Sequence, residues 1–262
     1  MPCTCINCAV QGQRQTIDIS LANELSSDEL DVVFKIMKEN FGHMFGGLQH
    51  TGMGAYAPGL SMPRFTAVGS KRFVQILHQP DHWICATNLF SESSHDVFLY
   101  DSLYSFIETS TVAQITSLLR DEDKPDIITF HIRKFRQQEL GTRLCGFYAV
   151  AAAFSCCLNI DPTGLEFDKF QLQRHLQQCL KSRKVTAFPS INTGRISSTT
   201  VVRKKLHCLC QNQSTKNMVQ CSFCSNWYHT KCVNVDDKQL LQVSLAWRGP
   251  CCDSVGPIIE LD

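Results

Sequence analysis

The cysteines of this 262-residue chain are clustered, and the clustering constrains its fold more than any other feature. Seven of the 15 cysteines fall between Cys208 and Cys252, and His229 lies among them. Cysteine pairs at short spacing, together with a histidine, are typical of a small domain held together by metal ions instead of a large apolar core. The sequence therefore predicts two folded units, a larger one followed by a small metal-bound one.

Composition excludes several protein classes. The chain is 44% hydrophobic and 19% charged, which is ordinary for a globular protein and excludes a long disordered or rod-like chain. Its net charge of +1 gives no global field for nucleic acid. No apolar run approaches the ~18 to 20 residues that cross a bilayer, and the first residues do not resemble a signal peptide. We expect no membrane partner, and a nuclear or cytoplasmic protein with reduced thiols.

The larger unit is predicted to mix helices and strands. Ser26 and Glu29 form a capping box before an apolar helical pattern that stops at Gly42. The other expected helices are Val112–Leu119, Gly146–Cys157 and Phe170–Leu180, and the expected strands are Phe73–Leu77, Trp83–Thr87, Asp96–Tyr100 and Asp126–Ile132. This order predicts an α+β fold over residues 20–185.

Three further segments are expected to lie outside the folded units. Residues 1–19 read as a tail; Cys3, Cys5 and Cys8 lack a visible fourth ligand, so we favour a frayed tail over a metal site. Residues 186–205 are rich in Ser and Thr, and 181–205 hold seven basic and no acidic residues. They predict a linker, either a solvated connector or a segment that contacts phosphates or serves as a nuclear import signal. Residues 255–262 form a second tail.

Four residues of the larger unit suggest thiol chemistry. His82 precedes a strand, Asp101 ends the next one, and Cys145 stands directly before the alanine-rich helix. A helix N-terminus favours a thiolate, an imidazole can take the thiol proton, and a carboxylate can orient the imidazole. The backbone N–H of Cys145 and the side-chain amide of Gln138, with Gln137 as the second choice, could stabilise an oxyanion.

The order HW, YDS, then Q and CG resembles the ubiquitin-like-protein proteases, the SUMO proteases and their adenovirus-protease relatives. FVQILHQPDHWICATN and LCGFYAVAAA are similar to members found beside transposons in invertebrates. The resemblance implies a papain-like or adenain-like fold with a mixed central sheet. It also implies cleavage after the terminal Gly-Gly of a ubiquitin-like modifier. Trp83 matches the tryptophan of a glycine-only tunnel, and Gly146 allows close approach beside the nucleophile.

The sequence departs from this family at three points, one of which is that the second tryptophan of the tunnel, in a WLND-like motif, is not visible. Leu144 precedes the nucleophile where Asp or Ser is usual, and position 139, where the family has Gln, is Glu. Two other functions therefore stay open. One is a catalytically decayed scaffold that acts as a chromatin- or histone-binding adaptor. The other is acyl transfer by the same thiol machinery, as in some bacterial effectors on this fold.

The second unit, residues 206–254, carries interleaved metal ligands. Tetrahedral Zn²⁺ takes four Cys or His ligands, and close pairs close such a site readily. The candidates are Cys208, Cys210, Cys221, Cys224, His229, Cys232, Cys251 and Cys252.

This pattern resembles a PHD finger with two cross-braced zinc sites. The resemblance assigns the first site to Cys208, Cys210, His229 and Cys232. The second site would use Cys221, Cys224 and two late cysteines, but Gly249 stands where its seventh ligand belongs. PHD fingers often read histone tails through an aromatic cage; Trp227 matches one wall and Met218 another, although Trp227 packed beside the zinc is equally expected.

These features combine into one leading hypothesis. The chain is expected to be a cysteine isopeptidase for a ubiquitin-like modifier or its conjugates, targeted by a zinc-bound PHD finger. A histone tail is a further expected partner, and nucleic acid would be contacted only through the basic linker.

Overall fold

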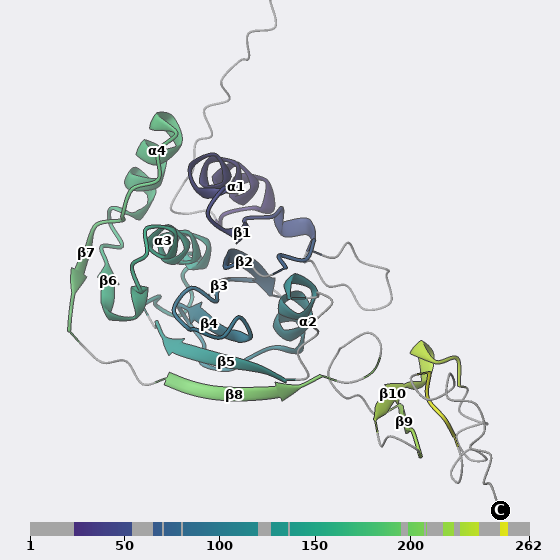
Figure 1. Cartoon of the computed structure of the whole chain (residues 1–262). Helices are drawn as coiled ribbons and strands as arrows, with labels where there is room; N and C mark the ends of the chain where they lie inside the picture. The colour runs from purple at the N-terminus through teal and green to yellow at the C-terminus, as the bar shows by residue number, and fades with distance from the viewer. Residues whose placement is uncertain are drawn as a thin grey trace, which may run out of the picture.

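A six-stranded mixed sheet forms the centre of the larger unit in this computed structural model (Figure 1). The structure describes residues 24–53, 65–69, 71–79, 81–119, 127–135, 137–194, 199–206, 208, 217–222, 226–235 and 247–250. The strands, in sheet order, are β1 (Gly46–Gly47), β2 (Phe73–Gln79), β3 (His82–Thr87), β4 (Asp96–Asp101), β5 (Ile127–Lys134) and β8 (Thr199–Lys205). The pairs β1–β2 and β4–β5 are parallel, and the other three are antiparallel.

Helices cover both faces of this sheet. The α-helices are α1 (Ser27–Phe41), α2 (Thr109–Leu118), α3 (Cys145–Cys157) and α4 (Leu172–Ser182), and short 3-10 turns lie at Thr51–Met53 and Pro162–Gly164. Alternate strand residues divide between two apolar clusters: Ile76 and Tyr100 face α1, α3 and α4, whereas Leu77 and Leu99 face α2. Figure 1 shows α3 and α2 on opposite sides of the sheet. The predicted α+β fold with a mixed central sheet is confirmed.

The ends of α1 and the composition of α3 explain how these helices form. The side chain of Ser26 accepts from the N–H of Glu29, and the Glu29 carboxylate accepts from the N–H of Ser26 at 2.7 Å, so the predicted capping box is present. All residues of α3 are buried. Its alanines leave room for close packing on β3 and β2, which holds α3 and its first residue, Cys145, against the centre of the sheet.

The linker prediction for residues 186–205 is wrong where these residues form strands. β7 (Ser190–Asn192) pairs with β6 (Leu165–Phe167), and β8 pairs with β5 from Thr199 to Lys205. The composition is basic, but Thr199–Val202 is a β-branched run, and β5 needs a neighbour for its outer row of backbone groups. The larger unit therefore extends beyond residue 185, to at least Lys205.

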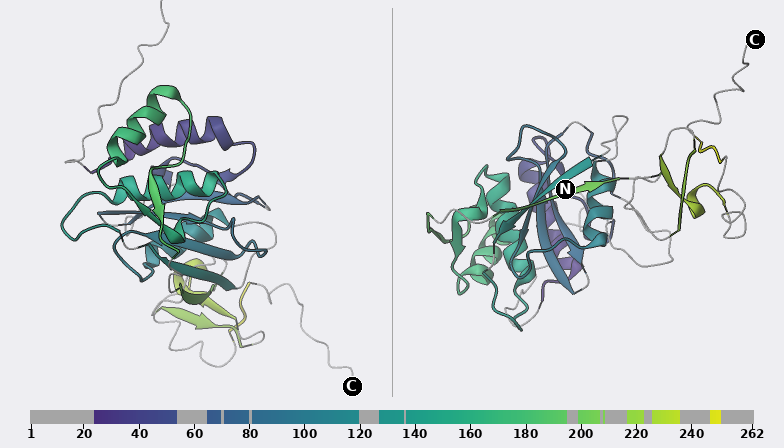
Figure 2. Two further views of the ribbon diagram at one scale, coloured as in Figure 1. Left: turned by 90° about the vertical axis from the view of Figure 1, so that its left-hand side faces the viewer. Right: turned by 90° about the horizontal axis from the view of Figure 1, so that it is seen from below.

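A separate hairpin follows the sheet. It joins β9 (Met218–Gln220) to β10 (Trp227–His229), and a 3-10 turn (Thr230–Cys232) comes next. Its own small core contains Val219, Cys221 and Tyr228, and Figure 2 shows it beyond the β8 end of the sheet. Among the described helices of the whole chain, none has the length and apolar character that spanning a membrane requires. The tails at 1–19 and 255–262, with Cys3, Cys5 and Cys8, lie outside the described residues.

Candidate functional site

His82 and Asp101 meet because β3 and β4 are antiparallel neighbours, so the start of β3 lies beside the end of β4. His82 Nε2 is 2.8 Å from Asp101 Oδ1, and each residue is only 3% exposed. The same carboxylate oxygen accepts from the backbone N–H groups of Leu103 and Tyr104, each at 2.8 Å. These two donors fix the position of the carboxylate, so Asp101 can orient the imidazole as the sequence predicted.

The thiol of Cys145 is a second neighbour of His82. Cys145 is the first residue of α3, so its backbone N–H has no partner within the helix. His82 Nδ1, the ring nitrogen that does not contact Asp101, is also buried. Burial, the largest single influence, lowers the pKa of His82, but the hydrogen bond and charge of Asp101 and the neighbouring Cys145 outweigh it and raise the pKa to about 9. At neutral pH the ring of His82 is therefore protonated.

The two candidate oxyanion donors are both held by the fold. Gln138 is 7% exposed; its side-chain oxygen accepts from Ser102 Oγ at 2.9 Å and its amide nitrogen donates to the carbonyl of Thr142 at 2.7 Å. The amide nitrogen of Gln137 donates to the carbonyl of Leu165, and its oxygen accepts from the N–H of Phe167. Gln137 thus connects to β6, whereas Gln138 is tied to Ser102, the residue after Asp101.

The residues expected to contact substrate are tightly packed. Trp83 is 3% exposed, and its ring centroid is 4.4 Å from that of His78. At Gly146, an added Cβ would come within 2.8 Å of the Cβ of Leu25, so only glycine fits there without displacement. The space beside Gly146 is filled by Leu25, which belongs to the segment that leads into α1.

Sequence reasoning missed three residues around the site. Ser102 fixes Gln138, Tyr104 places its ring edge-on to His82 at 5.2 Å, and a carboxylate oxygen of Glu24 lies 4.0 Å from Cys145 Sγ. Ser102 and Tyr104 lie one and three residues after Asp101, so their nearness to Asp101 in the sequence could have pointed to them. Glu24 is 121 positions from Cys145, and no local pattern points to it.

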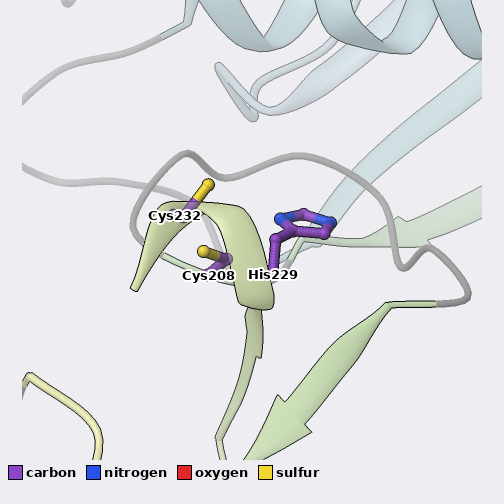
Figure 3. Close-up of side chains that lie close together, drawn as sticks. All are labelled: Cys208, His229 and Cys232. Atoms are coloured by element: carbon purple, nitrogen blue, oxygen red, sulfur yellow. The ribbon is translucent and has the colours of Figure 1, made fainter. Parts of the chain in front are cut away.

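The hairpin unit brings three of the predicted metal ligands together. The ligand atoms of Cys208, His229 and Cys232 all lie within 4.8 Å of one another, and Figure 3 shows their side chains grouped beside the 3-10 turn. Two thiols and an imidazole form a donor set that suits a borderline-soft ion such as Zn²⁺. The fourth predicted ligand, Cys210, lies outside the described residues.

The predicted second metal site is only partly described. Cys221 is fully buried, and its Sγ accepts from the backbone N–H of Gly249 at 3.3 Å. An added Cβ on Gly249 would lie 2.6 Å from Tyr228 Cε2, so the position that lacks the expected ligand is filled by an aromatic ring. The other predicted ligands, Cys224, Cys251 and Cys252, lie outside the described residues.

The hairpin register places both candidate cage residues on one face. Trp227 pairs with Gln220 and His229 pairs with Met218, so these four side chains share a face and Tyr228 occupies the other. Trp227 is 42% exposed, while Tyr228 packs on Trp247. Trp227 and Met218 are therefore diagonal neighbours, within reach of one bound side chain.

Comparison with known proteins adds no family to this description. A scan against protein-family models gives no match, and a search of curated proteins gives none either.

Proposed function

We propose that this chain is a cysteine peptidase that cleaves after the C-terminal Gly-Gly of a ubiquitin-like modifier. The observation that carries the proposal is the buried arrangement of Asp101, His82 and Cys145, in which the His82 ring contacts the Asp101 carboxylate through Nε2 and has the Cys145 thiol as its other neighbour. The family resemblance of the motifs around these residues supplies the substrate class. A papain-like or adenain-like fold for the larger unit belongs to the same proposal.

The chemistry follows from the charges. The imidazolium of His82 stabilises the thiolate of Cys145, which attacks the carbonyl carbon of the terminal glycine. The C–N bond then breaks as His82 gives its proton to the leaving amine, and a thioester remains on Cys145. Water, deprotonated by the now neutral His82, attacks the thioester carbonyl; the C–S bond breaks, the glycine carboxylate is released, and the thiolate and imidazolium are restored.

Gln138 and the Cys145 backbone supply the oxyanion donors in this proposal. A side-chain amide nitrogen carries two N–H groups, and Thr142 uses one of them in Gln138. The second N–H and the unpaired backbone N–H of Cys145 are the donors left for the developing oxyanion. Ser102 holds the amide in one orientation, so the donor is positioned before substrate binds.

Burial of the site favours a substrate without side chains at the scissile bond. Cys145, His82 and Trp83 are each 3% exposed. A terminus without side chains, such as Gly-Gly, needs the least space to reach a thiol that is buried to this degree.

The hairpin unit is proposed to be a PHD-type finger. Zn²⁺ would be held by Cys208, His229 and Cys232, with Cys210 as the fourth ligand, and it would stabilise the small unit without taking part in cleavage. Trp227 and Met218 would contact a histone tail and bring the peptidase to nuclear substrates.

The test is covalent labelling with ubiquitin and SUMO proteins that carry a C-terminal electrophile. We expect one of them to form an adduct with the full-length, zinc-loaded chain, seen as a mass increase. Cys145→Ala should abolish the adduct, and Cys179→Ala, which removes a buried thiol on α4, should retain it. Absence of any adduct from the folded chain would contradict the proposal.

A second candidate function is a histone-binding adaptor built on a decayed peptidase scaffold. The observation that favours it is that the amides of both Gln137 and Gln138 already donate to backbone carbonyls. An adaptor would bind histone-tail peptides, and Cys145→Ala would bind them with the same affinity as the natural chain. The adaptor would form no adduct with either electrophilic modifier. Retention of binding together with modifier-specific labelling would favour the peptidase.

A further inference from the structure

The carboxylate of Glu24 is held beside the candidate nucleophile by the chain on its C-terminal side. Its Oε1 lies 4.0 Å from Cys145 Sγ. The next residue, Leu25, is 1% exposed and packs directly over Gly146, and Ser26 caps α1. Because Leu25 and Ser26 are both fixed, the backbone of Glu24 is held at the start of α1, and its side chain reaches the thiol from there.

Few of the described groups around the Glu24 carboxylate carry a positive charge. The groups that face it are the thiol of Cys145 on α3 and His78 on β2, and His82 on β3 lies across the thiol. Burial lowers the pKa of His78, while Glu24 and Asp81 partly oppose this. No described Lys or Arg forms an ion pair with Glu24.

A carboxylate in this place discriminates between substrates by charge. It repels an anionic group that approaches the thiol and attracts a cationic one, and because Glu24 is partly buried beside the buried thiol, solvent screens this interaction less than at an open surface. A neutral polar side chain of the same size would hold the same space without such a preference.

We infer that Glu24 is a specificity-determining residue that selects substrates with a positive charge beside the bond to be cleaved. This rests on the proposed peptidase function and narrows its substrate class to modifiers joined to basic polypeptide segments, in which Lys or Arg side chains flank the modified amine. The cationic side chain pairs with Glu24 while the glycine carbonyl reaches Cys145.

The test measures the charge preference at Cys145 without needing a substrate. The full-length chain is treated with three methanethiosulfonate reagents carrying aminoethyl (cationic), methyl (neutral) and sulfonatoethyl (anionic) groups. The rate of modification of Cys145 is followed by mass spectrometry of its peptide. Because the same thiolate attacks all three reagents, the ratio of the cationic to the anionic rate cancels any change in thiolate fraction and reports the local field.

We expect Glu24→Gln to lower this ratio by roughly tenfold. Glu24→Asp keeps the negative charge, so the ratio of the cationic to the anionic rate should stay close to that of the natural chain. The matched control is Glu92→Gln, which removes an exposed carboxylate from the turn at the far end of β3 from His82. A ratio unchanged in Glu24→Gln, or changed equally in Glu92→Gln, would overturn the inference. Because the ratio does not depend on cleavage, this failure is distinct from failure of the modifier-probe labelling.

Discussion

Replacing Asp101 by Asn should leave the His82 ring deprotonated, and therefore neutral, at neutral pH. The pKa of His82 is raised from 6.5 to about 9, chiefly by Asp101 against the opposing effect of burial. Each pKa unit corresponds to about 1.4 kcal/mol, so the protonated ring contributes about 3 kcal/mol to folding. A group with a raised folded-state pKa contributes this stability below pH 6.5 and loses it as the pH rises towards 9. In Asp101→Asn the raising influence of Asp101 is lost, while burial still lowers the pKa of His82, so this pKa should fall from about 9 towards its ordinary value of 6.5.

Two measurements test this prediction. The first follows the ring C–H resonance of His82, assigned by its absence in His82→Ala, between pH 5 and pH 10; we expect the midpoint to move from about 9 to about 6.5 or lower. The second is urea unfolding, followed by circular dichroism, at pH 6.5 and pH 9.5. The natural chain should lose about 3 kcal/mol over this interval from His82, and Asp101→Asn should not.

The matched control is Asp96→Asn. Asp96 faces His131 at 3.7 Å, but both side chains are partly exposed, so solvent screens the pair and the pH dependence should hardly change. A His82 midpoint that stays above 8 in Asp101→Asn would refute the assignment of Asp101 as the group that keeps the ring charged.

Two further predictions concern stability. Ser26→Ala removes the side-chain acceptor at the start of α1 and should lower the free energy of unfolding by about 1 kcal/mol in urea titrations, whereas loss of 0.2 kcal/mol or less would contradict the capping role. Gly249→Ala places a Cβ against the buried ring of Tyr228 and should destabilise the hairpin unit by about 1 to 3 kcal/mol. The variant should therefore lose Zn²⁺ more readily to a colorimetric chelator. The control is Gly164→Ala, which should retain the metal because the nearest atom is 3.5 Å from the added Cβ.

Local patterns in the sequence were sufficient for most of the helices and strands. The capping box at Ser26 and the apolar runs of β2 to β5 depend on neighbours in the chain, so they could be read directly. Thr199–Lys205 was misassigned because its basic and hydroxyl residues suit a solvated linker as well as an edge strand. What decided between the two was the unpaired outer edge of β5, which lies about 70 residues earlier.

The sequence by itself determined which chemistry the chain can carry. A thiol before an alanine-rich helix, a histidine and an aspartate at strand ends, and clustered Cys and His ligands define that chemistry through residue type and spacing. Only the tertiary structure decided which groups share a site. It joined His82 to Asp101, tied Gln138 to Ser102 and Thr142, and set Glu24 beside Cys145. Such contacts depend on how distant segments pack into a common core, and spacing along the chain does not encode that directly.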